Sequence, residues 1–149
     1  LVEFMVAVVP PAAAVAATVT NVINLWLAGR VVKFSGRLAR PWPDLPAMTF
    51  PPLAAAALAV ALAVSFAGGM AGIVAGVATA ALVMAYGILG FAVLHAITRG
   101  QPSRAFLIGG IYASVLVFGW PVLMLSLLGL ADTVFHLRAR VARRRGTLV

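Results

Sequence analysis

The chain has 149 residues, of which 64% are hydrophobic and only 9% are charged, and its mean hydropathy is +1.12. Soluble globular domains carry about 25% charged residues, so this composition excludes an ordinary water-soluble domain. The absence of cysteine excludes disulfides, thiolate metal sites and a cysteine nucleophile.

The net charge of +8 suggests nucleic acid as a partner, but the placement of the basic residues argues against it. Each of three basic clusters lies next to an apolar run, which is the positive-inside pattern of membrane proteins. We therefore expect no nucleic-acid partner. The clusters are Arg30, Lys33, Arg37 and Arg40; Arg99 and Arg104; and Arg138, Arg140, Arg143, Arg144 and Arg145.

The fold class follows from the stretch between Leu45 and Thr98, which contains no Asp, Glu, Lys or Arg. Because about 20 apolar residues cross a bilayer, this stretch is long enough for two helical crossings. We predict an all-α protein, a polytopic transmembrane helical bundle forming a single domain over residues 1–149. About five spans are expected, at approximately 9–34, 52–67, 70–97, 105–119 and 121–137. Since the chain begins at Leu1 without a leader pattern, we expect it to be the C-terminal part of a longer protein.

The first predicted span begins at Pro10 and Pro11 and ends near the first basic cluster, which places residues 1–3 on the outer side. Thr20, Asn21 and Asn24 lie near its middle and must find partners there, so their face should point into the bundle. They are the candidate solute-binding residues. The alternative is that they only form hydrogen bonds between helices.

The second and third spans follow a proline-rich cytoplasmic connector, residues 35–51, and turn at Gly68 and Gly69 on the outer side. Small residues at four-residue spacing let another helix approach closely, so we assign a helix-packing role to these glycines. They are Gly68, Gly72, Gly76, Gly87 and Gly90.

Residues 105–137 are too long for one span, and a single crossing would put the Arg-rich tail outside. We predict two short helices that turn at Gly119, Trp120 and Pro121, with Trp120 at the outer interface and the C-terminus in the cytoplasm. A re-entrant hairpin is the alternative.

Asp132, His136 and Arg140 are spaced i, i+4, i+8 near the end of the last predicted span. With His95 at a similar depth, His95, Asp132 and His136 form a possible ion or proton site; interfacial ion pairing is the alternative. The five arginines of the tail are expected to contact anionic lipid headgroups or a partner protein. No sequence motif for catalysis, phosphate binding or a metal is present, so we expect a protein that is not an enzyme and has no cofactor.

Three segments together resemble the C-terminal half of the YybS-like bacterial membrane proteins, a family catalogued as a domain of unknown function. They are NLWLAGRVVKFSGRLARPWPDLP, GFAVLHAITRG and IYASVLVFGWPVLMLSLLGLADTVFHLRAR. The family is loosely similar to the substrate-capturing S-components of energy-coupling-factor transporters. The resemblance implies a multi-pass protein of the bacterial inner membrane with an outward-opening solute pocket and a cytoplasmic face for partner subunits.

The expected function is therefore a non-enzymatic subunit that binds a small solute for uptake. The alternative is a structural or scaffolding membrane protein that recruits partners through its basic cytoplasmic loops. Membrane lipids are the partners expected in either case, and other membrane or cytoplasmic subunits are further candidates.

Overall fold

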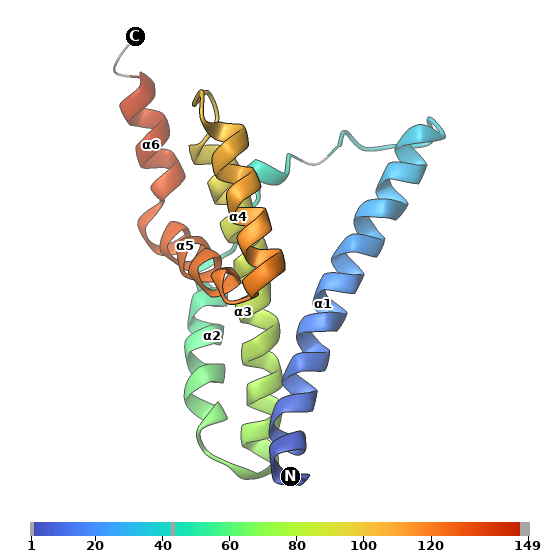
Figure 1. The fold of residues 1–149 in the computed structure, drawn as a ribbon, viewed down its shortest axis with the longest axis vertical. Coiled ribbons are helices and arrows are strands. Elements are labelled where there is room, and N and C mark those ends of the chain that lie inside the picture. The colour runs from blue at the N-terminus through green and yellow to red at the C-terminus, as the bar shows by residue number, and fades with distance from the viewer. Residues whose placement is uncertain (1, 43, 147–149) are drawn as a thin grey trace. The chain divides into compact units, whose positions relative to one another are not determined.

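The computed structural model describes residues 2–42 and 44–146, and every regular element among them is a helix. This agrees with the predicted all-α class. The helices, coloured along the chain in Figure 1, are α1 (Val2–Phe34), a 3₁₀ turn (Leu45–Ala47), α2 (Pro52–Ser65), α3 (Gly69–Ile97), α4 (Arg104–Phe118), α5 (Pro121–Phe135) and α6 (Leu137–Gly146).

Two of the described helices, α1 with 33 residues and α3 with 29, are long and apolar enough to cross a membrane. A third candidate is α5 continued by α6 as far as Arg143, although the two are bent by 70°. The expected five spans are not supported. α2 has 14 residues and α4 has 15, so each is about 21–23 Å long and falls short of the ~30 Å hydrocarbon layer.

The chain divides into two compact units. One contains α1, the end of α2 and the first half of α3 (Leu1–Asp44 and Ala59–Leu82), and the other contains the remainder (Leu45–Leu58 and Val83–Val149). We call them the α1 unit and the α5 unit. The single predicted domain is thus built from two parts, each with its own packing.

In the α1 unit, α1 begins at Val2, earlier than residue 9, and Pro10 and Pro11 lie inside the helix instead of opening it. A proline lacks the N–H that would bond the carbonyl four residues earlier. Membrane helices tolerate this where other groups lie near the freed carbonyls. The carbonyls concerned belong to Val6 and Ala7.

In the α5 unit, the C-terminal half of α3 is the centre of the packing. Tyr86, Leu89 and Val93 are fully buried there. The side chains packed against them come from the connector, α2, α3 and α5: Met48, Phe50, Ala54, Ala55, Leu58, Ile97, Leu128 and Leu130. The segment after the 3₁₀ turn and the first half of α2 therefore lie along the second half of α3.

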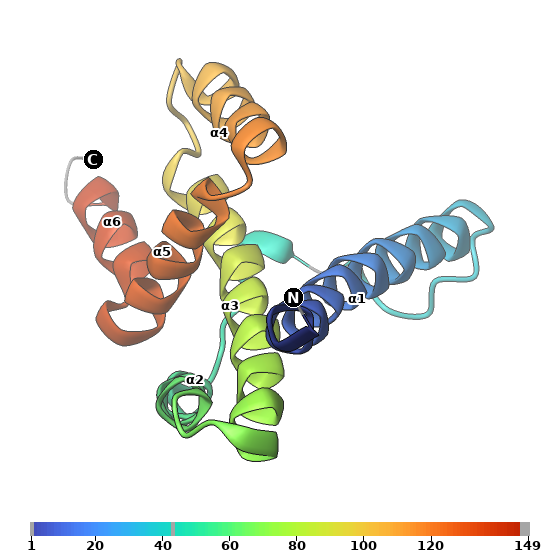
Figure 2. The same cartoon turned by 60° about the horizontal axis from the view of Figure 1, so that its bottom comes forward.

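α5 crosses this half of α3 at very short range (Figure 2). A Cβ at Gly90 would overlap the Leu125 carbonyl, and a Cβ at Gly129 would overlap the Tyr86 carbonyl. The Ser126 hydroxyl donates to the Val83 carbonyl across the contact, at 2.7 Å. Glycine on both helices is thus required for this approach.

Candidate functional site

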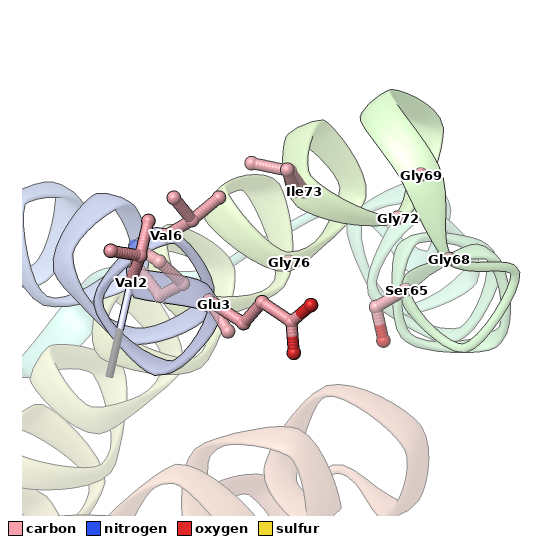
Figure 3. Close-up of a pocket in the computed structure, with 11 residues that line it drawn as sticks. Val2, Glu3, Val6, Ser65, Gly68, Gly69, Gly72, Ile73 and Gly76 are labelled. Atoms are coloured by element: carbon pink, nitrogen blue, oxygen red, sulfur yellow. The ribbon is translucent and has the colours of Figure 1, made fainter.

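The α1 unit contains a cavity of about 450 Å³ between the first turns of α1 and the turn that joins α2 to α3. Figure 3 shows the Glu3 side chain extending from α1 toward Ser65, with the backbone of Gly68, Gly69 and Gly72 behind it. We call it the Glu3 cavity. Binding sites for small molecules measure about 300–1,000 Å³, so this volume suits a small solute.

The walls of the Glu3 cavity are mostly apolar, and the polar side chains that line it are those of Glu3 and Ser65. The Glu3 carboxylate has no ion-pair partner among the described residues. The Ser65 hydroxyl donates its proton to the Leu62 carbonyl at 2.6 Å, which leaves its lone pairs available to accept. Val6 and Ala7, whose carbonyls lack their helical donors because of Pro10 and Pro11, also line the cavity.

Three local features of the sequence shape this cavity. Glu3 lies in the first turn of α1, where the positive end of the helix dipole favours an ionised carboxylate. Gly68 and Gly69 adopt positive φ values of 72° and 59°, which turn the chain between α2 and α3. Gly76 lies opposite Pro11, where an added Cβ would come within 3.9 Å of the proline ring. A larger side chain at this position would therefore enter the cavity.

The predicted solute-binding residues lie elsewhere. Thr20, Asn21 and Asn24 are exposed on α1, and no described residue gives their side chains a hydrogen-bond partner. The expectation that their face points into the bundle stays a prediction. Thr18, on another face of the same helix, donates to the Ala14 carbonyl at 2.8 Å.

The glycines predicted to pack helices together lie in different surroundings. Gly87 and Gly90 lie against α5, where a Cβ on Gly87 would meet the side chains of Val122 and Ser126 at 3.1 and 3.2 Å. Gly72 faces the Ser65 carbonyl, where a Cβ would lie 3.2 Å away. Gly68 is not part of a packing face, because it lies in the turn before α3 and its added Cβ would meet no atom within 4 Å.

The i, i+4, i+8 arrangement of Asp132, His136 and Arg140 is wrong, because the helix breaks inside it. His136 ends α5 in the left-handed conformation, with φ 53° and ψ 48°. Asp132 consequently pairs with Arg138: Nη2 lies 2.7 Å and Nε 2.8 Å from Oδ2, and the Arg138 backbone N–H donates to Oδ1 at 2.9 Å.

Arg138 also ties the tail to the connector, because its Nη1 donates to the Pro46 carbonyl at 2.6 Å. The Asp132 side chain is only 5% exposed and that of Arg138 only 16%, so both charges are satisfied inside the α5 unit. An ion pair is therefore formed by Asp132, with Arg138 as the partner in place of Arg140.

The structure does not bring His95, Asp132 and His136 together. The His95 Nδ1 lies 2.9 Å from the Phe91 carbonyl, and its ring meets the edge of Tyr112 at 6.0 Å between centroids. His136 is exposed at the bend. Within residues 2–42 and 44–146, no group of three His, Asp or Glu side chains is placed to hold a metal ion.

Of the five tail arginines proposed to contact lipid or a partner, Arg138 is committed to the ion pair with Asp132. Arg140 is exposed on α6, and the Arg143 Nε donates to the Ala139 carbonyl at 3.4 Å. The side chains of Arg144 and Arg145 lie outside the described part of the chain. Two members of the first basic cluster lie over aromatic rings: Arg30 over Trp26 at 5.3 Å, and Lys33 over Trp42 at 5.0 Å.

Reasoning from the sequence missed Glu3, Ser65 and the two proline-freed carbonyls. The signal was present, since Glu3 is one of three acidic residues in the chain and precedes a Pro-Pro pair by two helical turns. It was missed because the prolines were interpreted as the start of the helix.

No family model, no curated protein and no solved structure matches this chain. The resemblance to YybS-like membrane proteins stays a prediction.

Proposed function

We propose that the protein is a non-enzymatic membrane protein that binds a small organic cation in the Glu3 cavity. The observation that carries this proposal is a carboxylate with no ion-pair partner among residues 2–42 and 44–146, facing a largely apolar cavity of about 450 Å³. The charge of an organic cation would be attracted by the Glu3 carboxylate. Its apolar body would pack against the apolar walls. Val6 and Ala7, whose carbonyls lack a helical donor, are among the lining residues.

The sidedness of the cavity is proposed from the basic clusters. Arg30 and Lys33 at one end of α1, and Arg99 after α3, fall on the cytoplasmic side by the positive-inside rule. Glu3 and the Gly68 turn lie at the opposite ends of these two helices. The cavity would therefore open outward, as expected for uptake across a bacterial inner membrane.

We further propose three crossings: α1, the segment 45–65, and α3. α4 and α5 would form a re-entrant hairpin. Their turn is at Gly119, directly before the residues that touch α3, and Val122 contacts Gly87. Gly87 lies ten residues before the end of α3 at Ile97, which is about 15 Å, or half the thickness of the hydrocarbon layer. Both hairpin ends, near Arg104 and Arg138, would then be cytoplasmic.

A charge-selective labelling experiment tests the cavity. Because the chain has no cysteine, Ser65→Cys places a single thiol in the wall. We expect it to react faster with a trimethylammonium-bearing methanethiosulfonate than with the sulfonate-bearing reagent. Glu3→Gln should slow the cationic reagent by roughly fivefold, which corresponds to the ~1 kcal/mol attraction of unit charges about 4 Å apart in water, and should speed the anionic reagent.

Asp44→Asn is the matched control, because Asp44 is the other exposed carboxylate among the described residues and does not line the cavity. It should leave the ratio of the two rates unchanged. A ratio that is the same with and without the Glu3 charge would contradict the proposal.

A scaffolding role remains the competing function, and Gly76→Leu separates the two. The added side chain should occupy part of the cavity and weaken solute binding. A protein that acts only as a scaffold should bind its partners equally well with this substitution. If Gly76→Leu binds a cationic probe as tightly as the original chain, the solute is not bound in the Glu3 cavity.

A further inference from the structure

The side chains around the Glu3 cavity narrow the kind of cation that the cavity suits. Among the described lining residues, none is aromatic and none has a side-chain N–H group. The polar side chains come from two elements, Glu3 from α1 and Ser65 from the end of α2, and Figure 3 shows Glu3 extending toward Ser65. The chemistry of these two side chains therefore decides which cations are held well.

Both side chains are set to accept hydrogen bonds. An ionised carboxylate such as that of Glu3 has acceptor oxygens and no proton to donate. The Ser65 hydroxyl has a single proton, which it donates to the Leu62 carbonyl at 2.6 Å, so its lone pairs are what it offers to a solute. A solute that complements both groups has to bring the donors itself.

The main chain of Ser65 adds a further acceptor. Ser65 is the last residue of α2, so its carbonyl has no donor within that helix. Among the described residues, no backbone N–H donates to it. An added Cβ on Gly72, which also lines the cavity, would lie 3.2 Å from this oxygen. The C-terminal end of a helix also has partial negative charge, which favours a cation.

We propose that the solute of the Glu3 cavity is a protonated amine, a cation whose nitrogen has N–H groups, and not a quaternary ammonium ion. This inference rests on the proposed function, because it concerns the same cavity and the same carboxylate. One N–H would donate to Glu3 and another to the Ser65 hydroxyl, which replaces the hydrogen bonds that the amine loses with water. Hydrogen bonds between an ammonium and a carboxylate are among the strong ones in proteins.

A quaternary ammonium ion has the same charge but no N–H group. Proteins that recognise such ions surround them with aromatic rings, and no described lining residue provides one here. Its methyl groups would also displace water from the oxygens of Glu3 and Ser65 without giving them a hydrogen bond, and acceptors left in this way cost free energy. We therefore expect both kinds of ion to bind through their charge, and the protonated amine to bind more tightly.

A calorimetric titration of the full chain in detergent with three related cations tests this preference. Benzylammonium, N,N-dimethylbenzylammonium and benzyltrimethylammonium share one apolar body, and near neutral pH the two amines are protonated. The dissociation constant of benzylammonium should be at least tenfold lower than that of benzyltrimethylammonium. N,N-Dimethylbenzylammonium should lie between them, because it keeps one N–H group.

Ser65→Ala tests the part played by the hydroxyl. It should weaken the binding of benzylammonium about tenfold, the effect expected for a hydrogen bond to a charged group, and that of benzyltrimethylammonium much less. Ser114→Ala is the matched control, because the Ser114 hydroxyl also donates to a carbonyl of its own helix, that of Gly110 at 2.8 Å, and does not line the cavity. It should change neither constant. Equal weakening of both cations by Ser65→Ala would contradict the proposed hydrogen bond.

The cation series separates this inference from the proposed function. If benzylammonium and benzyltrimethylammonium bind equally tightly and both depend on Glu3, the preference for N–H groups is wrong and the cation site stands. Tighter binding of the quaternary ion leads to the same conclusion. If neither cation binds, the proposed function fails and this inference fails with it. The series uses the unaltered chain, so the comparison does not depend on the folding of any variant.

Discussion

At the scale of single residues, the chain depends on a few positions where the chemistry of one side chain decides the local structure. Gly90 and Gly129 allow α3 and α5 to touch backbone to backbone. Asp132 and Arg138 compensate each other's charge at a buried position. Both features predict large effects from small substitutions, with controls available in the same chain.

Gly90→Ala should destabilise the protein by roughly 1–3 kcal/mol, because the added methyl overlaps the Leu125 carbonyl and forces α3 and α5 apart. Gly109→Ala, in α4, meets no atom within 4 Å and should stabilise by up to about 1 kcal/mol through helix propensity. Thermal unfolding in detergent measures both. Equal melting temperatures for the two variants would contradict the close α3–α5 contact.

Arg138→Ala should cost about 3–5 kcal/mol, because it leaves the Asp132 carboxylate buried without a partner. Arg140→Ala removes an exposed cation two residues away and should stay within about 0.5 kcal/mol of the original chain. Adding Asp132→Asn to Arg138→Ala should recover part of the loss. If Arg140→Ala proves the more damaging variant, the pairing derived from the structure is wrong.

At the scale of helices, the sequence pattern predicts the helical class and some of the helix ends, but not all of them. The helical class, the break at Gly119 and the start of α5 at Pro121 were predictable, because glycine and proline mark ends and starts of helices. The break at His136 was not, since no proline or glycine is present there to signal it. The Asp132–Arg138 contact depends on that break, so it too lay beyond the sequence.

Helix length was the second failure at this scale. The sequence shows an apolar run at 105–119 but does not determine whether this segment crosses the membrane or turns back within it. Only the contact of Gly87 with Val122 gives the depth of the turn relative to α3. In the same way, Pro10 and Pro11 are compatible with a helix start or with a helix interior, and tertiary packing decides between them.

His136→Gly tests the α5–α6 bend. A non-glycine residue in the left-handed conformation costs about 1–2 kcal/mol, so glycine should stabilise the protein or leave it unchanged. His136→Val should destabilise it, because a branched side chain is strained in this conformation. If α5 and α6 formed one continuous helix, glycine would instead cost about 1 kcal/mol. The sign of the change in melting temperature therefore decides between a bend and a straight helix.

The α4–α5 hairpin makes a separate prediction about accessibility. Trp120→Cys, at its tip, should react with a membrane-permeant maleimide and resist impermeant reagents added from either side of sealed vesicles. A cysteine at Gly68 should react from the outer side. If Trp120→Cys reacts with the impermeant reagent from the outer side, α4 and α5 are two full crossings and the hairpin proposal fails.

At the scale of the whole molecule, the two units differ in what their residues form. The α5 unit is held by buried aromatic and aliphatic side chains, close glycine contacts and one ion pair. The α1 unit contains the Glu3 cavity and the exposed asparagines of α1. Substitutions in the α5 unit are therefore expected to act on stability, and those in the α1 unit on binding.

The central claim is that the Glu3 cavity binds an organic cation through its carboxylate, and a calorimetric titration of the full chain in detergent tests it most directly. We predict saturable binding of benzyltrimethylammonium and none of benzenesulfonate. Glu3→Gln should weaken the binding about tenfold or more, which corresponds to at least ~1.4 kcal/mol, and Asp44→Asn should leave it unchanged. Binding of equal strength in the original chain and in Glu3→Gln, or no saturable binding of the cation at all, would contradict the account.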